Sequence, residues 1–189
     1  MRRQRASRPP RVPFGRPVSV TPRSETGDGE SLQLAAVNLE RHAIQGDQTA
    51  EASKTGVRGL IAARTALNPC EVVEKFKAIL HERPYEFRYA LRIIPVEKVV
   101  ETSLENMGLA AAELAKGIGE NESFRVTVEK RFTTLHAQEI IEAVATRISR
   151  RVDLDKPDLV LLIEVVGKFT GLSLVKPELI ISVQKEKML

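Results

Sequence analysis

The sequence predicts an α/β (α+β) protein with two small, tightly joined sheets. The first observation is a continuous apolar run at 159–166 with a single acid, which is typical of a buried central strand and is too short to span a membrane. The second is the alternation of apolar and polar residues at 123–131, which indicates a half-buried strand. The third is helical periodicity between such strands, which favours strand-helix-strand units.

The elements of this fold begin at residue 56. Residues 56–64 are expected to form a first strand. Asn68 and Pro69 mark a helix start, because Asn is a favoured N-cap residue and proline is favoured at the first helical position. That helix is expected to end before Pro84, and the alternation at 87–93 predicts a second strand. Together these elements make half of a ferredoxin-like pattern.

The second half of the chain carries two more helices and at least three strands. In chain order they are expected at 104–118 (helix), 123–131 (strand), from 136 onward (helix), 159–166 (strand) and 169–175 (strand), and 179–183 could add one more strand.

Residues 1–55 are predicted to be a disordered, Arg/Pro-rich extension, because they cannot bury enough apolar surface to offset their ordering entropy. Only 31–44 has a helical spacing of apolar residues. Seven arginines and no acid precede Glu25, so the extension could contact phosphates, could be a targeting peptide, or could have little role. Its prolines argue against the amphipathic helix of a targeting peptide.

The charge of the folded part is nearly balanced. The whole chain has a net charge of +4, but from Lys54 onward 21 basic residues face 19 acidic ones. Any RNA affinity of this part must therefore come from basic residues that cluster on one face.

The cysteine and histidine content predicts neither a cofactor nor a metal site. A single cysteine, Cys70, excludes a disulfide framework and indicates a reducing, cytoplasmic setting. Cys70 lies near a helix start, where a thiol can be activated, but no histidine lies close to it in sequence. The three histidines are dispersed and form no ligand pattern.

Three segments in order, FRVTVEKR, HAQEIIEAV and VDLDKPDLVLLIEVVGKFTGLSLVK, resemble the THUMP domain, specifically its stand-alone form in the tRNA-acetylation adaptor family. Upstream, RYALRIIPV and LENMGLAA resemble the family's passage from an N-terminal ferredoxin-like part into that domain. The resemblance implies three regions: a disordered extension at 1–55, an N-terminal ferredoxin-like part at 56–96 and a THUMP domain at 97–187.

The resemblance also implies tRNA binding. Members of that family present tRNA to an acetyltransferase that forms N4-acetylcytidine in the D-arm, and THUMP domains fused to other modification enzymes deliver tRNA to a separate catalytic module. The 189 residues contain no GxGxxG motif, P-loop or deaminase motif. We therefore expect an adaptor that is not an enzyme and has no membrane association. Its expected partners are tRNA and an RNA acetyltransferase or another tRNA-modifying enzyme.

The RNA contacts implied by these motifs are basic residues near strand ends. They are Lys130, Arg131, Lys168 and Lys176, with Arg88 and Arg92 of the strand at 87–93 extending the strip. Glu164, the acid inside the central run, is expected either to pair with a nearby cation or to make a polar contact in the domain interface.

The alternative function is a non-catalytic regulatory or assembly module, because ferredoxin-like sheets often pair edge to edge. Basic residues that converge on one groove would favour RNA binding. Scattered basic residues beside an open apolar sheet edge would favour assembly.

Overall fold

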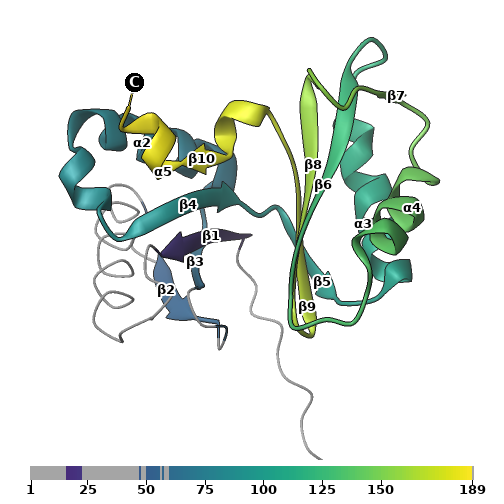
Figure 1. Cartoon of the computed structure of the whole chain (residues 1–189), viewed down its shortest axis with the longest axis horizontal. Coiled ribbons are helices and arrows are strands. Elements are labelled where there is room, and N and C mark those ends of the chain that lie inside the picture. Colours follow the sequence, from purple (N-terminus) through teal and green to yellow (C-terminus); the bar gives the residue numbers. More distant parts are fainter. Residues whose placement is uncertain (1–15, 23–46, 48–49, 56, 58–59, 189) are drawn as a thin grey trace, which may run out of the picture.

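Two five-stranded sheets organise the computed structural model, which describes residues 16–22, 47, 50–55, 57 and 60–188 (Figure 1). The first sheet has the order β10-β4-β1-β3-β2, and the second has the order β5-β9-β8-β6-β7. The mixed α/β class and the two joined sheets expected from the sequence are confirmed.

The first unit consists of the first sheet and the helices that cover it. All its strand pairs are antiparallel. Its elements are β1 (Arg16–Pro22), β2 (Glu51–Lys54), β3 (Ile61–Thr65), α2 (Pro69–Glu82), the 3-10 helix η1 (Pro84–Phe87), β4 (Ala90–Pro95), β10 (Ile181–Ser182) and α5 (Val183–Glu186). As the sequence predicts, Asn68 caps α2, since its side-chain oxygen accepts a hydrogen bond from the Cys70 N–H at 2.9 Å.

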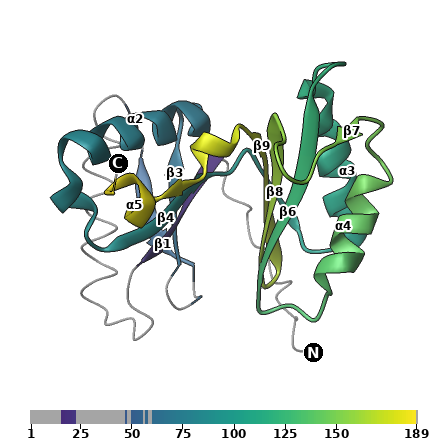
Figure 2. The same ribbon diagram turned by 45° about the horizontal axis from the view of Figure 1, so that its top comes forward.

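The second unit is the second sheet with two helices on one face. Strand β6 runs parallel to β7 and β8. Strand β9 runs antiparallel to both of its neighbours, β8 and β5. Its elements are β5 (Lys98–Glu101), α3 (Leu104–Leu114), the 3-10 helix η2 (Ala115–Gly117), β6 (Ser123–Arg131), α4 (Ala137–Ala145), β7 (Arg151–Val152), β8 (Leu159–Val166) and β9 (Phe169–Val175). Figures 1 and 2 show α3 and α4 on the side of this sheet that faces away from the first unit.

Strand β8 belongs to two hydrophobic cores. Leu161 and Ile163 point to the helices of the second unit and pack with Met107. Val160 and Leu162 point the other way and join the core of the first unit. The continuous apolar run of β8 therefore has a structural cause, because both of its faces are buried.

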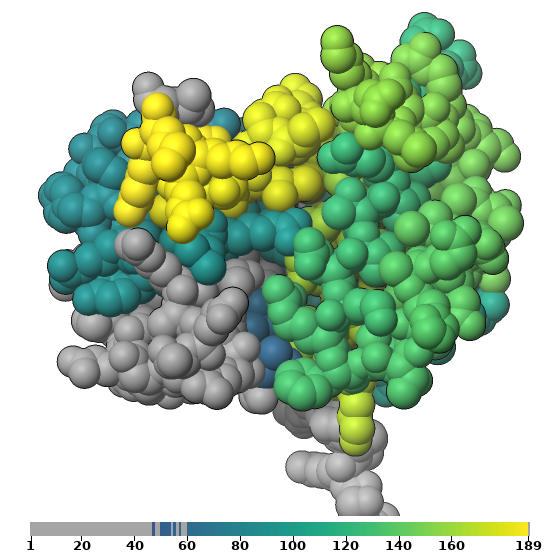
Figure 3. Space-filling view, in the orientation of Figure 1, coloured from purple at the N-terminus to yellow at the C-terminus, as the bar shows by residue number. Residues whose placement is uncertain are grey.

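The C-terminal segment returns to the first unit. After β9 and the 3-10 helix η3 (Pro177–Leu179), β10 pairs with β4, with Ile181 opposite Ile93. Glu186 of α5 then forms a hydrogen bond with His81 Nε2 at 2.7 Å and an ion pair with Lys77 at 3.4 Å. The space-filling view shows this yellow segment lying on the teal first unit (Figure 3). Strand β9 is thus the last strand of the second sheet along the chain. The region expected to be the THUMP domain, 97–187, therefore includes residues that belong to the first unit.

Two stretches of the expected disordered extension are strands. β1 lies between β3 and β4, with Val18 opposite both Ala63 and Pro95, and β2 lies at the edge of the same sheet. The prediction failed there because partners distant in sequence supply the hydrogen bonds, while β1 itself contains prolines, which are rare in central strands. The rest of 1–55, apart from residues 47, 50 and 55, lies outside the described residues, including the possible helix at 31–44.

Strand β4 starts later than the sequence predicts. Phe87 ends η1 instead of starting a strand, and its ring packs edge-on to Phe76 of α2 at 6.2 Å between centroids. The buried residues of β4 are Ala90 and the consecutive run from Ile93 to Pro95, so the expected alternation is wrong. The reason is that β4 leads directly into the joint between the two units, where both of its faces are covered.

Among the described residues, no helix is long and apolar enough to cross a membrane.

The shared strand leads to a prediction about stability. Leu162→Ala should lower the free energy of unfolding by about 2–5 kcal/mol, because it leaves a cavity between the two units. Ile163→Ala, on the opposite face of the same strand, is the matched control. Urea unfolding followed by circular dichroism should show one transition for both variants. A separate early transition in Leu162→Ala alone would contradict a core that joins the units.

Candidate nucleic-acid interface

Strands β6 and β8 finish at the same end of the second sheet. Their register places Lys130 opposite Val165 and Arg131 opposite Val166. The N–H of Gly167, in the turn after β8, donates to the carbonyl of Arg131 at 2.9 Å, which ties the two strand ends together. We call the residues that gather here the basic edge: Lys130, Arg131, Phe132, Lys168 and Phe169.

The two lysines of the basic edge carry charges that no described residue neutralises. Lys130 and Lys168 are both exposed, and neither forms an ion pair with any residue that the structure describes. An exposed ammonium group without an acid partner is available to a phosphate.

Both helices of the second unit begin near the basic edge. Helix α3 follows Glu101, which lies opposite Phe169 in the sheet. Helix α4 follows its N-cap residue His136, shortly after the end of β6. Because the N-terminus of a helix carries a partial positive charge, both helices add to the positive potential there.

The two arginines at the joint have acid partners. Arg131 Nη1 lies 3.0 Å from Glu164 Oε2, and Arg92 Nη1 lies 3.5 Å from Glu164 Oε1. Arg92 also pairs with Glu129 at 3.0 Å. Since Arg92 comes from β4 and the other three from the second sheet, this cluster links the two units. Glu164 therefore does both things that the sequence left open, as it pairs with cations and lies in the interface.

The carboxyl group of Glu164 is almost fully buried, with 6% of its side chain exposed. Burial raises the pKa of Glu164 above its ordinary value of 4.5, and Arg92 and Arg131 only partly oppose this effect. The arginines are thus needed to hold a buried charge. The contacts observed for Arg92 and Arg131 are these ion pairs, and a role of the two arginines in RNA binding stays a prediction.

Arg88 lies away from the basic edge. It belongs to the turn after η1 rather than to a strand, and its guanidinium carbon lies 5.0 Å from the centroid of the Tyr89 ring. The sequence predicted that Arg88 and Arg92 share one face of a strand, and this prediction is wrong because Arg88 precedes the strand. The error follows from the late start of β4.

Lys176 lies at the opposite end of the second sheet. It follows Val175, which pairs with Val160 near the start of β8, whereas Lys168 precedes β9. Eight residues of extended chain separate the two lysines by about 25 Å. The six predicted contacts therefore do not form one strip: Lys130, Arg131 and Lys168 converge, Arg92 adjoins them at the joint, and Arg88 and Lys176 lie apart.

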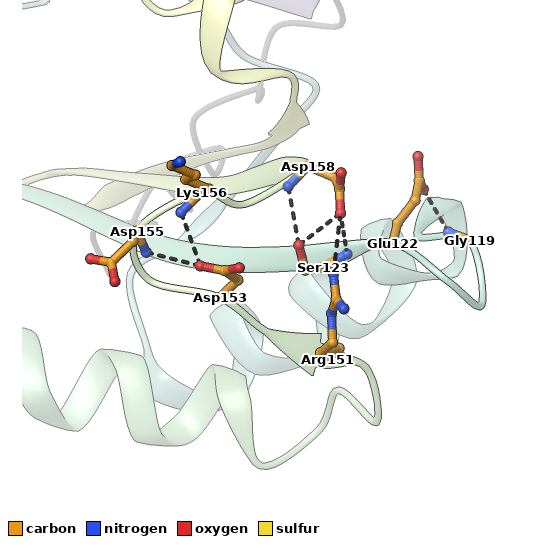
Figure 4. A network of polar contacts seen from close by, with 8 residues as sticks. All are labelled: Gly119, Glu122, Ser123, Arg151, Asp153, Asp155, Lys156 and Asp158. Atoms are coloured by element: carbon orange, nitrogen blue, oxygen red, sulfur yellow. Dashed lines mark hydrogen bonds and ion pairs between the residues drawn. The ribbon is translucent and has the colours of Figure 1, made fainter.

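The end of the sheet opposite the basic edge carries several acidic residues beside Arg151 and Lys156 (Figure 4). Asp158 accepts hydrogen bonds from the backbone N–H and the hydroxyl of Ser123, both at 2.7 Å, and these bonds hold its pKa below the ordinary value. Asp153 accepts from the N–H groups of Asp155 and Lys156. Acids therefore gather where β6 and β8 begin, and Arg151, Lys156 and Lys176 lie at that same end.

A shallow pocket lies between edge strand β5 and helix α3, lined in part by Val99, Val100 and Leu109. Leu109 is exposed, and a Lys98–Glu113 ion pair joins the two elements beside it. An apolar sheet edge is therefore open, as the assembly alternative requires. Three of the six predicted contacts converge at the basic edge and two lie apart, so the criterion for RNA binding is met in part and that role stays a prediction.

Two aromatic residues of the basic edge were missed by the sequence analysis. Phe132 and Phe169 are exposed beside the lysines. Both directly follow a basic residue at a strand end, but nothing in the sequence distinguishes an exposed phenylalanine there from a core residue.

The family model of the THUMP domain matches residues 101–175, a range that contains the whole basic edge. The chain therefore contains a THUMP domain. The match covers the second unit from the end of β5 to the end of β9.

Solved structures share the fold of both units. PH1313 from Pyrococcus horikoshii is 22% identical over 85% of this chain and 55% of its own, with a TM-score of 0.60. TrmN from Thermus thermophilus is 19% identical over 84% of this chain and 45% of its own, with a TM-score of 0.53. A 4-thiouridine synthetase in complex with RNA and bound ATP is 16% identical over 86% of this chain and 42% of its own, with a TM-score of 0.52.

No curated protein sequence matches this chain. The chain spans about half the length of the structures it resembles, and at these identities the likeness shows the fold.

The expectation that the protein is not an enzyme has to be corrected. The same fold occurs within the 4-thiouridine synthetase, an enzyme whose chain is more than twice as long as the matched part. The lack of a catalytic motif in this segment therefore does not separate it from enzymes. The expectation rested on the missing catalytic motif, and a fold shared with an enzyme shows that this reason is insufficient.

The buried cluster gives a prediction about pH. The folded state raises the pKa of Glu164, so its favourable contribution to stability is present at low pH and is lost as pH rises through the folded-state pKa. Glu164→Gln removes this titration. Relative to the variant, the wild type should gain stability as pH falls from about 7 towards 4.5, because other groups cancel in the difference. Thermal unfolding of both proteins across this range measures it, and a constant difference would contradict it.

Proposed function

We propose that this chain binds tRNA for a tRNA modification reaction and that the basic edge contacts the RNA backbone. The observation that carries the proposal is a THUMP domain whose strands end at two exposed lysines that have no acid partner in the described part of the chain. One similar structure, the 4-thiouridine synthetase, is in complex with RNA, which supports an RNA ligand for this fold. The sequence resemblance adds tRNA as the particular RNA.

The chemistry of the basic edge suits structured RNA. Proteins recognise RNA helices mainly by shape and by contacts to phosphates and 2′-hydroxyls. Lys130 and Lys168 supply the charges, and the two helix N-termini strengthen the potential. Arg131 and Arg92 stabilise the position of the basic edge, because their ion pairs with Glu164 hold the two units together.

The finer part of the proposal concerns the enzyme that modifies the bound tRNA. From the resemblance to the tRNA-acetylation family, we propose an RNA acetyltransferase that forms N4-acetylcytidine in the D-arm. The proposal includes a cytoplasmic location, which the single cysteine supports because free thiols are typical of reducing compartments.

The lysines provide the direct test. The Lys130→Ala/Lys168→Ala variant should bind tRNA more weakly, and the slope of log affinity against log salt should fall by about 2, because about one counterion-releasing contact is lost with each lysine. Fluorescence anisotropy over a salt series measures both. Lys116→Ala is the matched control, since Lys116 is exposed near the end of α3 that is distant from the basic edge.

All three proteins should unfold at the same temperature, because the substituted side chains are exposed. Equal tRNA affinity and equal salt slopes in the double variant and the wild type would show that the basic edge does not hold the RNA.

The finer proposal needs a separate assay. Radioactive acetyl transfer to tRNA by an RNA acetyltransferase should increase when the wild-type chain is added, and the increase should be smaller with the double variant because less tRNA is presented. The Lys116→Ala variant should act like the wild type. Acetylation that is the same with and without the chain would refute the acetyltransferase part and leave tRNA binding to be judged by anisotropy.

A further inference from the structure

Phe132 combines two features that folding does not require. The residue is 76% exposed, the highest exposure of any aromatic residue that the structure describes. Its backbone φ is +55°, and among the described residues no other residue except glycine has a positive φ. An exposed ring contributes little burial energy, and a bulky side chain in the left-handed region is strained.

Smaller residues would satisfy this position better. Glycine adopts the left-handed conformation without strain, and asparagine tolerates it. Phe132 is not part of either hydrophobic core of the described structure. The demand for a phenyl ring must therefore come from outside the fold, and strained residues of this kind concentrate at functional sites.

The backbone around Phe132 is held firmly. The preceding carbonyl, of Arg131, accepts the N–H of Gly167 at 2.9 Å, and Gly167 is itself left-handed with a φ of +59°. After Phe132, the hydroxyl of Thr133 accepts the N–H of Leu135 at 3.2 Å. The ring is thus displayed from a fixed turn at the end of β6, which lowers the entropy that a ligand must overcome to bind it.

The surroundings of Phe132 indicate the kind of ligand. Lys130 lies two residues before it, and Lys168 follows Gly167 across the tied strand ends. An apolar protein surface or a lipid tail would match the ring but not two exposed ammonium groups that no described residue neutralises. An RNA strand matches both, because its phosphates suit the lysines and its bases present flat faces to an aromatic ring.

We infer that Phe132 stacks on an unpaired base of the RNA bound at the basic edge. The inference rests on the proposed function and adds a residue and a recognition element to it. Bases inside a duplex have both faces covered by neighbouring pairs, so the stacked base must come from a single-stranded segment or from the end of a helix.

The substitutions at Phe132 are chosen to separate its chemical properties. Phe132→Trp keeps an aromatic face, Phe132→Leu keeps an apolar side chain without one, and Phe132→Asn suits the left-handed backbone but cannot stack. The chain has no tryptophan, so the new indole is the sole tryptophan signal.

The binding test compares three RNA hairpins with the same stem. One is blunt, and the others carry four unpaired nucleotides at the 3′ or the 5′ end. The wild type and Phe132→Trp should prefer one of the overhangs, and that RNA should quench the tryptophan fluorescence. Phe132→Leu and Phe132→Asn should lose about tenfold in affinity for the preferred hairpin and bind the blunt one unchanged.

A stability measurement excludes a folding defect. Phe132→Asn should raise the melting temperature by about 2–4 °C, because it relieves backbone strain in a chain of this size. Tighter folding together with weaker binding is the signature of a residue kept for its ligand.

Any of three results would overturn the inference. One is a Phe132→Asn variant that binds the overhang hairpins as the wild type does, and another is tryptophan fluorescence that RNA leaves unchanged. A wild type that binds tRNA but ignores overhangs would also overturn it while leaving the proposed function intact. A wild type that binds no RNA would refute the proposed function itself.

Discussion

The burial of β8 on both faces is the constraint on which the rest of the structure depends. One face must be covered by the helices of the second unit and the other by the first unit, so neither unit completes its core alone. This requirement fixes the register of the strand, because a shift by one residue would exchange the two faces. It also means that Glu164 requires cationic partners, since its carboxylate is enclosed between the units.

The division of labour between arginine and lysine follows from that constraint. A buried carboxylate needs several oriented donors, and the planar guanidinium group supplies them better than an ammonium group does. Arg92 and Arg131 approach Glu164 from different units. The lysines at the strand ends have no such partner among the described residues and face solvent. Basic residues that look alike in the sequence therefore divide into an inner pair that joins the units and an outer pair available to a ligand.

Sequence reasoning succeeded where local signals were sufficient. The bounds of β6, β8 and β9 were predicted because their apolar patterns are dictated by the layers around them, and α2 was predicted because Asn68 and Pro69 act within one turn. Strand β1 was missed because its partners lie more than 40 residues away in the chain. Phe87 was misplaced because its contact with Phe76 competes with a strand pattern.

The candidate site was predictable only in part. The periodicity placed Lys130 and Lys168 at strand ends, and the resemblance implied their role in RNA binding, which stays a prediction. The partners of Arg92 and Arg131 were not, because the ion pairs join residues from three strands. The conformation of Phe132 depends on the turn that faces it and has no signature in its own neighbourhood.

The return of the C-terminal segment to the first unit has a consequence for how the protein is made. β10 and α5 complete a sheet and a helix pair whose other members lie near the start of the folded chain. On the ribosome, the first unit cannot reach its final form until residues 181–186 have left the exit tunnel. The second unit is synthesised before that point, so all its strands are available while the first unit still lacks β10 and α5. The unit whose synthesis begins first is therefore the last to have all its elements.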